Sequence, residues 1–482
     1  MEYSQILKDL RRESGLVKNR IQSIIFDSKY VAQFSEFPLV ANERCGLWYV
    51  EPTNTAGSVY FKSTDGHTSQ WKFSMRRLNF HLLDFFQKTP TVILVDSTRK
   101  GKLMPDALLK TVPMWCAVLN YIMFEDEETD EWADLANENW LLTPREMVSE
   151  SEHSTMIRLI PDHAREVKKL GLISKQGLIE RLGCKKPILP LWVYPGKKSQ
   201  KVVMSEDHLS ICCLTASHKS NSGTDVPGWN FSQPYVQGAA DDHELWASLD
   251  ICEGKLDHNL LWNDIYYEPA EELRVIDTIT GDICLWISED EFLTRISRIY
   301  EKSKREPEEL SLDVTSLKNT GIMIGAITKH ISISEITKTN RCIKHIVVLS
   351  EKWTITQLPE KAPEKAPEKC TVSTQSFEVE SSKKGSKKLR EILPQIMQNI
   401  ESVDLLNQTL ILCDTGKDLS AGVALTLLAR FFDTNWDPVT PLPHVNKDTI
   451  KQHLCHVLDC RQVNPSRNTL QSINTFLMSN GH

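Results

Sequence analysis

The sequence predicts a multi-domain α/β fold in which strands buried on both faces alternate with helices. Residues 91–96 (TVILVD) form a continuous apolar run that ends in a polar loop, and Pro105 opens a helix beyond it. Residues 408–414 (QTLILCD) repeat this arrangement near the other end of the chain, before a glycine-bearing loop and an apolar helix. With 482 residues the chain has room for about two to four such units.

A proline-containing repeat indicates where the chain divides. Residues 358–369 read PEK three times, and SSKKGSKK follows at 381–388. Such segments are extended and pack poorly. We therefore predict an N-terminal catalytic region at 1–355, a Pro/Lys-rich linker at 356–388 and a compact C-terminal α/β domain at 389–482.

The charge and cysteine content narrow the class of protein. A net charge of −8 argues against a general nucleic-acid coat protein, and we expect no DNA partner. A local basic face remains open, and two groups could supply it. One is the run Lys383, Lys384, Lys387, Lys388 and Arg390, and the other is Arg76 and Arg77 followed by Arg99, Lys100 and Lys102. The twelve cysteines include no Cys-x-x-Cys pair, which fits neither a zinc site nor a disulfide framework.

Free thiols in this number are typical of a reducing compartment. The first residues mix acids with bases and lack the apolar core of a signal peptide. We identify no apolar run of the ~18 residues that a membrane helix needs. The expectation is a cytoplasmic or nuclear protein with no membrane partner.

The loop after the first buried strand is the leading candidate for a phosphate site. It contains one carboxylate, two hydroxyls, a glycine and three cations: Asp96, Ser97, Thr98, Arg99, Lys100, Gly101 and Lys102. Arg and Lys grip phosphates, an Asp can hold Mg²⁺, and backbone N–H groups at a following helix N-terminus favour anions. The alternative is a surface loop whose Asp caps the helix, since the loop matches no Walker or dinucleotide-binding pattern.

A second candidate follows the small-residue turn at 237–240. Four ionisable residues stand together there: Asp241, Asp242, His243 and Glu244. The two aspartates could bind Mg²⁺, and any of the four could act as a general base. The competing interpretation is an acid-rich first helical turn that complements the helix dipole.

A third group lies around the Asp-Gly turn at 65–66. Lys62, Asp65, His67 and Arg76 would suit a ribose-phosphate site, with aromatic residues nearby for stacking on bases. On spacing alone, the favoured interpretation is a simple hairpin joined by this turn. Short strands are predicted before it, at 48–50 and 58–62.

The loop after the C-terminal strand is arranged like that of a cysteine phosphatase. Its candidate residues are Cys413, Gly416, Lys417 and Ser420. In such enzymes an Arg six residues after the Cys holds the phosphate oxygens, but Leu419 occupies that position here. Asp414 directly after the Cys also disfavours a thiolate. A loop that binds an anion or is purely structural fits better than an active phosphatase.

Long blocks in both halves of the chain carry a family resemblance. They are ANERCGLWYV (41–50), YFKSTDGHTSQWKFSMRRLNFHLL (60–83), ILVDSTRKGKLMPDALLKTVPMWCAV (93–118), YVQGAADDHELWA (235–247), ILCDTGKDLSAGVALTLL (411–428) and NPSRNTLQSINTFLM (464–478). These blocks resemble the initiator-tRNA ribosyl-phosphate transferases of fungi and plants. The resemblance implies a family-specific N-terminal catalytic region and a C-terminal domain with a dual-specificity-phosphatase-like fold.

The resemblance also implies the reaction. Phosphoribosyl pyrophosphate would donate a 5-phosphoribosyl group to the 2′-hydroxyl of adenosine 64 of initiator methionine tRNA, which excludes that tRNA from elongation. We expect Mg²⁺ to accompany the pyrophosphate. A phosphatase-like hydrolase using Cys413 and a non-catalytic RNA-binding protein are the alternatives.

For this reaction, we expect Arg99, Lys100 and Lys102 to hold the donor phosphates, with Asp96 and Thr98 supporting metal or ribose. Residues 241–244 would supply the base and the metal ligands, and the group around 62–76 ranks second. Both polar loops must then converge in one pocket, so residues 96–102 should lie beside residues 241–244.

Overall fold

The computed structural model describes residues 16–43, 45–62, 71, 74–75, 77–125, 132–196, 202, 204–240, 251–254, 256–305, 313–339, 343–356, 372–398, 400, 408–439 and 445–479. The chain divides into two compact units. The first comprises Met1–Lys169 and Ile173–Glu306, and the second comprises Pro307–His482 with Leu170–Leu172. Each unit is an α/β structure and is described by itself.

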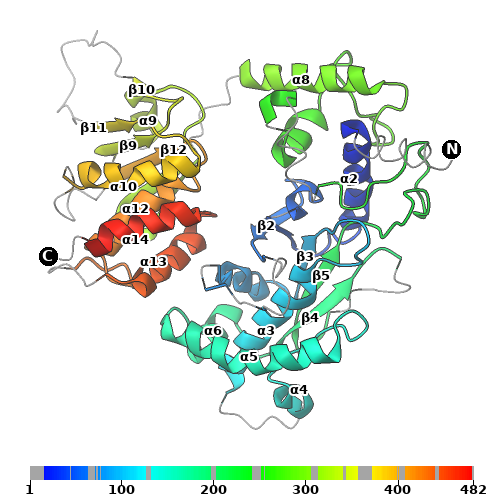
Figure 1. Cartoon of the computed structure of the whole chain (residues 1–482), viewed down its shortest axis with the longest axis horizontal. Coiled ribbons are helices and arrows are strands. Elements are labelled where there is room, and N and C mark those ends of the chain that lie inside the picture. Colours follow the sequence, from blue (N-terminus) through cyan, green and yellow to red (C-terminus); the bar gives the residue numbers. More distant parts are fainter. Residues whose placement is uncertain are drawn as a thin grey trace. The chain divides into compact units, whose positions relative to one another are not determined.

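A five-stranded parallel sheet forms the centre of the first unit (Figure 1). Its strands are β1 (Leu39–Asn42), β2 (Thr55–Val59), β3 (Thr91–Asp96), β4 (Ile188–Val193) and β5 (Leu209–Thr215). They lie in the order β2-β1-β3-β5-β4, and every neighbouring pair is parallel. β3 and β5 are buried along their whole length, as their unbroken apolar runs predict for central parallel strands.

One face of this sheet is covered by the helices that follow β3. A π-helical turn, η3 (Ala107–Thr111), leads directly into α3 (Val112–Phe124), which packs against β4, α5 (Glu150–Lys169) and α6 (Lys175–Leu182). The short helix α4 (Ala133–Asn137) and the 3-10 helix η2 (Phe80–Gln87) belong to the same unit. The segment Ala107–Phe124 is apolar and long enough to span a membrane, but 89% of it is buried inside the unit.

This segment differs from the sequence-based expectation, which found no apolar run of such length. Its apolar character is interrupted by Lys110, Pro113 and Asn120. Asn120 is fully buried and bonds the backbone of Ile188 at the start of β4, with distances of 2.8 and 2.9 Å. The segment is therefore a core helix tied to the sheet by a polar side chain.

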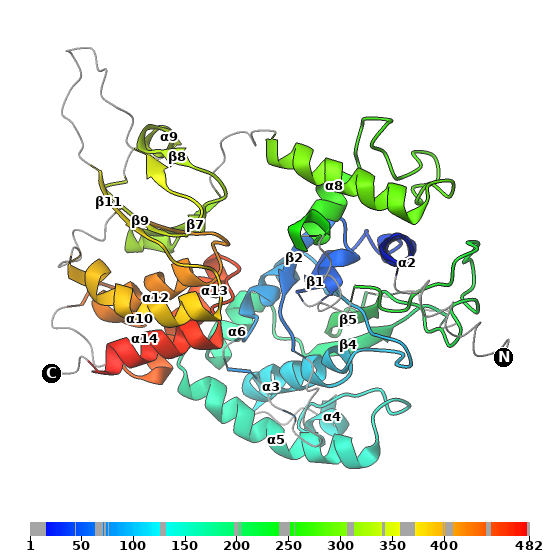
Figure 2. The same cartoon turned by 45° about the horizontal axis from the view of Figure 1, so that its top comes forward.

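The other face is covered by α2 (Val17–Ala32), the π-helical turn η6 (Leu260–Ile265) and the short η1 (Gly46–Trp48) and η5 (Ile251–Gly254). α8 (Glu289–Arg305) packs on α2, η5 and η6, on the side away from the strands (Figure 2). Ile21, Ile24 and Ile25 of α2 share one apolar core with Ile93 and Val95 of β3. Residues 48–50, expected as a strand, are instead the last residue of η1 and the two residues after it. The predicted hairpin turn at 65–66 lies outside the described residues.

The second unit has its own five-stranded sheet in the order β11-β9-β12-β7-β6. The strands are β6 (Val314–Ser316), β7 (Ile322–Ala326), β9 (His345–Leu349), β11 (Ser373–Phe377) and β12 (Thr409–Cys413), and only the β6–β7 pair is antiparallel. β8 (Ile331–Ser332) and β10 (Ile355–Thr356) form a separate parallel pair. The short η7 (Lys318–Thr320) precedes β7, and α9 (Ile333–Thr339) follows β8. The larger helices are α10 (Lys383–Gln398), α12 (Leu419–Phe431), α13 (Lys447–Cys460) and α14 (Arg467–Ser479).

The division between the units differs from the predicted boundary at residue 355. β7 and β9 were assigned to the N-terminal region, yet both pair with β12 of the C-terminal strand–loop–helix. β11 and the first turn of α10 fall inside the predicted linker. Parallel pairing joins strands that are far apart in sequence, so a proline-rich segment can be an insertion within a domain instead of a link between two.

Candidate active site

The carboxyl ends of β1 and β3 form the topological switch point of the first sheet. The chain leaves β1 toward β2 on one side, and it leaves β3 toward β4 on the other. Open parallel sheets bind ligands in the crevice outside the carboxyl ends of two such strands. The loop predicted as a phosphate site, at 96–102, begins at this point.

Asp96 shapes this loop from inside. Its side chain is buried, with one oxygen 2.7 Å from Asn42 Nδ2 and the other 2.9 Å from both Cys45 Sγ and the Ser97 N–H. Because these partners occupy the carboxylate, Asp96 positions the loop; its predicted support of metal or ribose stays a prediction. Ser97 and Thr98 are also buried. The exposed part of the loop is Arg99, Lys100 and Gly101.

Two cations of this loop are available for an anion. The side chains of Arg99 and Lys100 are exposed and make no ion pair with the part of the chain that the structure describes. Lys102 differs, because its Nζ lies 2.8 Å from Asp106 Oδ2 and is partly neutralised. Lys62 is exposed at the end of the same edge, where Thr111 donates to its backbone carbonyl at 2.9 Å.

The segment at 235–240 packs directly against this loop. Gln237 Nε2 donates to the Lys102 carbonyl at 2.7 Å. Gly238 has a positive φ of 64°, and a Cβ placed on it would lie 2.4 Å from the Thr98 carbonyl oxygen. The buried carbonyl of Ala239 accepts a hydrogen bond of 3.0 Å from Arg20 Nε of α2. The chain therefore enters residue 241 beside the loop at 96–102.

Several predicted site residues lie outside the described part of the chain. They are Asp241, Asp242, His243 and Glu244, and also Asp65, His67 and Arg76. The convergence of 96–102 with 241–244 therefore stays a prediction. Among the described residues, no group of three or more acidic, His or Cys side chains could hold a metal ion.

A buried polar cluster beside the loop was missed by the sequence analysis. His218 Nδ1 lies 3.1 Å from Asp27 Oδ1, and the Tyr235 hydroxyl donates to both oxygens of Asp27 at 2.9 and 2.8 Å. Burial raises the pKa of Asp27 to about 6. The single local signal was a histidine immediately after a buried strand, and nothing in the sequence connects it to an aspartate 191 positions away.

Arg77, which the sequence suggested only as part of a basic face, lies at the same edge. The Arg77 guanidinium lies 3.5 Å from the centre of the Tyr60 ring and 3.9 Å from a Glu43 oxygen. Its neighbour Arg76 had been singled out instead.

The loop after β12 in the second unit is held by hydrogen bonds from within the same unit. Cys413 is fully buried, and its Sγ lies 3.1 Å from Ser420 Oγ. Arg461 Nε donates to the Gly416 carbonyl at 3.1 Å, and Asn464 N–H donates to the Lys417 carbonyl at 2.8 Å.

Carboxylates also flank this loop. Asp418, just before α12, accepts hydrogen bonds from Ser466 N–H at 2.8 Å and from Thr469 Oγ1 at 2.6 Å. Asp414 lies on the other side of the loop and accepts from Ser381 at 3.1 Å. Two acids and a buried thiol oppose the electropositive setting that a phosphatase nucleophile needs.

The first unit thus presents free cations and a closely packed second loop at a sheet switch point, which suits a group-transfer enzyme that handles phosphates. The chain belongs to the Rit1 family. Residues 10–284 match the model of the Rit1 N-terminal domain, and residues 373–477 match that of the Rit1 DUSP-like domain. The chain is accordingly a transferase, and its second unit contains a dual-specificity-phosphatase-like α/β domain, as predicted.

Two relatives match over nearly the whole chain. The tRNA A64-2'-O-ribosylphosphate transferase of Saccharomyces cerevisiae is 34% identical, over 99% of this chain and 95% of that protein. An uncharacterized protein of Schizosaccharomyces pombe is 30% identical, over 96% of this chain and 94% of that protein. Among solved structures, the Yvh1 phosphatase domain of Chaetomium thermophilum is 14% identical over 34% of this chain and 96% of that domain, with a TM-score of 0.24.

Proposed function

We propose that this chain transfers the 5-phosphoribosyl group of phosphoribosyl pyrophosphate to the 2′-hydroxyl of adenosine 64 of initiator methionine tRNA, in the cytoplasm. The observation that carries the proposal is the near-full-length similarity of this chain to the tRNA A64-2'-O-ribosylphosphate transferase of Saccharomyces cerevisiae. The donor, the initiator specificity and the exclusion from elongation rest on the sequence blocks that resemble the family. The site at the switch point of the first sheet is where we place the reaction.

The donor explains why free cations are needed there. It carries a phosphate on C5 and a pyrophosphate on C1, and negative charge collects on the pyrophosphate as its bond to C1 breaks. Preorganised cations at such a position stabilise the transition state more than the ground state. Arg99 and Lys100, exposed on a loop that buried groups hold in place, meet this requirement.

Mg²⁺ fits the same place. Gly238 packs against Thr98, and Asp241 and Asp242 follow three and four positions later in the sequence. Carboxylate oxygens are the ligands that Mg²⁺ prefers, and they would share the ion with pyrophosphate oxygens. The ion would add positive charge where the leaving group departs.

The tRNA would be bound through its backbone, because an A-form stem displays 2′-hydroxyls and phosphates while it hides most base edges. On α10 of the second unit, Lys384, Lys387, Lys388 and Arg390 are all exposed. These side chains are the proposed phosphate contacts. Contacts of this kind make affinity fall as salt rises.

The direct test is incubation of the full chain with Mg²⁺, radiolabelled phosphoribosyl pyrophosphate and tRNA. We expect label to enter initiator tRNA and to be absent from elongator methionine tRNA. A matched substrate is initiator tRNA with 2′-deoxyadenosine at position 64, which lacks only the accepting hydroxyl. Label that enters this deoxy tRNA as fast as the natural one would contradict the proposal, as would no transfer at all.

The phosphatase alternative predicts a different result. Because the Cys413 thiol is fully buried and flanked by carboxylates, we expect Cys413→Ser to leave transfer within about twofold and the full chain to hydrolyse no generic phosphomonoester. Cys455→Ser, another buried cysteine of this unit, controls for lost packing. Hydrolysis that disappears in Cys413→Ser and persists in Cys455→Ser would favour the hydrolase.

A further inference from the structure

The loop after β5 places an imidazole next to the cation-bearing loop. Ser217 Oγ donates to the Thr98 carbonyl at 3.1 Å and accepts the Thr98 N–H at 3.3 Å, which joins the loops that follow β5 and β3. His218 is the next residue. It therefore lies at the carboxyl edge of the sheet, where the donor is proposed to bind.

The orientation of this ring is set by its buried partners. Asp27 is fully buried, its Oδ1 faces His218 Nδ1, and Tyr235 holds both its oxygens while accepting the His218 backbone N–H at 2.8 Å. An ionised carboxylate at Nδ1 keeps the proton on Nδ1 and leaves the lone pair on Nε2. Among the described residues, no group forms a hydrogen bond with Nε2, and 16% of the His218 side chain is exposed.

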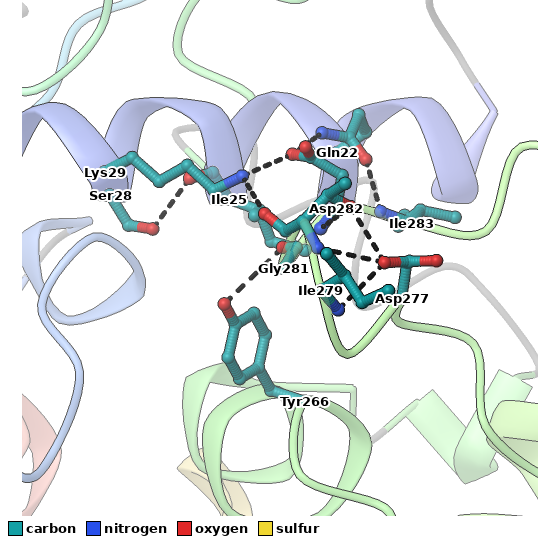
Figure 3. A network of polar contacts seen from close by, with 11 residues as sticks. Gln22, Ile25, Ser28, Lys29, Tyr266, Asp277, Ile279, Gly281, Asp282 and Ile283 are labelled. Atoms are coloured by element: carbon teal, nitrogen blue, oxygen red, sulfur yellow. Dashed lines mark hydrogen bonds and ion pairs between the residues drawn. The ribbon is translucent and has the colours of Figure 1, made fainter. Parts of the chain in front are cut away.

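The helix that carries Asp27 is fixed on two sides. Figure 3 shows the turn at 277–283 docked on α2, where Lys29 and Gln22 both bind Asp282 and the Ile283 N–H donates to Gln22 Oε1 at 2.6 Å. From the other side, Asn19 Nδ2 donates to the Pro234 carbonyl at 2.7 Å, and Ser23 Oγ accepts from Val236 N–H at 3.0 Å. These contacts keep the Asp27 carboxylate in one position relative to His218 before substrate binds.

Few titratable groups face the imidazole. From α2 these are Asp27 and Tyr30, whose ring centre lies 5.8 Å from that of His218, and from the 234–240 segment it is Tyr235. Phe26 packs against the ring at 5.1 Å between centres. Burial raises the pKa of Asp27 to about 6, so its carboxylate is ionised near pH 7 and gains a proton as the pH falls below about 6.

We propose that His218 is the base that accepts the proton of the attacking 2′-hydroxyl, and this assignment rests on the function proposed above. As the 2′-oxygen bonds to C1 of the donor ribose, the bond from C1 to pyrophosphate breaks and its electron pair leaves with pyrophosphate. The hydroxyl proton passes to His218 Nε2, and the Asp27 carboxylate stabilises the imidazolium. Asp27 is thus a positioning residue, and residues 241–244 are left with the metal role.

The test is the pH dependence of single-turnover transfer by the full chain. We expect His218→Ala to slow transfer by about 10²- to 10⁴-fold and to remove the fall in rate on the acid side, while tRNA affinity stays within about twofold. Added imidazole should restore part of the rate, because a small base can enter the space left by the ring. Asp27→Asn should slow transfer by about 10- to 10³-fold without abolishing tRNA binding.

Two further histidines serve as comparisons. His208, just before β5 at the opposite end of the strand, is the matched control, and His208→Ala should transfer at the wild-type rate. His243→Ala tests the rival base. The inference fails if His218→Ala transfers within about threefold of wild type, or if its loss leaves the acid limb intact and does not respond to imidazole. Absence of transfer by the wild-type chain would instead overturn the function itself.

Discussion

Replacing Arg99 with alanine is expected to slow ribosyl-phosphate transfer by about 10²- to 10³-fold while the protein stays folded. The side chain is exposed and forms no ion pair with the described residues, so its removal breaks no internal contact of the loop. What is lost is a cation at the place where the pyrophosphate develops charge. The measurement is kcat/KM for phosphoribosyl pyrophosphate, with circular dichroism and tRNA affinity as checks on folding and binding.

Arg165→Ala provides the matched control for Arg99. Arg165 is an exposed arginine of α5, paired with Asp162 one turn away on the same helix. Its loss removes the same charge from the same unit, so it should change neither kcat nor KM by more than about twofold. Equal losses in the two variants would show that net charge matters and the position of Arg99 does not.

Gly238→Ala is expected to cost about 2–4 kcal/mol of unfolding free energy and to lower the transfer rate by at least about 100-fold. The added Cβ would lie 2.4 Å from the Thr98 carbonyl oxygen and 2.9 Å from Arg99 Cα. Both are backbone atoms, so no rotamer change relieves the overlap. One of the two loops must move, and with it either the cations or the chain leading to residue 241.

The control for Gly238 separates backbone strain from this overlap. Gly196 also has a positive φ, of 87°, but a Cβ there would meet no atom within 4 Å. Gly196→Ala should therefore cost only about 1 kcal/mol and leave transfer unchanged. Thermal unfolding and single-turnover rates measure both effects. If the two variants lose stability and activity equally, the contact with Thr98 has no special role.

The parts of the fold that the sequence predicted are those with a local signal. β3, β5 and β12 are largely apolar because a central parallel strand is covered on both faces, and β3 and β12 are each followed by a loop and a helix. The position of the loop at 96–102 followed from the same signal. Which residues of this loop are buried and which are exposed could not be predicted, because Asp96 is held by Asn42 and Cys45, more than 50 residues away.

Features that depend on contacts between residues far apart in the sequence could not be predicted. The assignment of β7 and β9 to the second unit rests on their partnership with β12, which no local pattern records. The Asp27–His218 pair is of the same kind, because it joins a helix near the start of the chain to the end of β5. A lone histidine in a polar loop gives no sign of a buried acid beneath it.

The closed conformation of the loop after β12 bears on what happens to the product of the proposed reaction. The ribosyl group that the proposed reaction adds carries a 5-phosphate, which is a phosphate monoester. An active cysteine phosphatase hydrolyses esters of this kind. Because Cys413 Sγ is buried against Ser420 Oγ and Arg461 is bonded to the Gly416 carbonyl, we expect the second unit to leave this 5-phosphate in place.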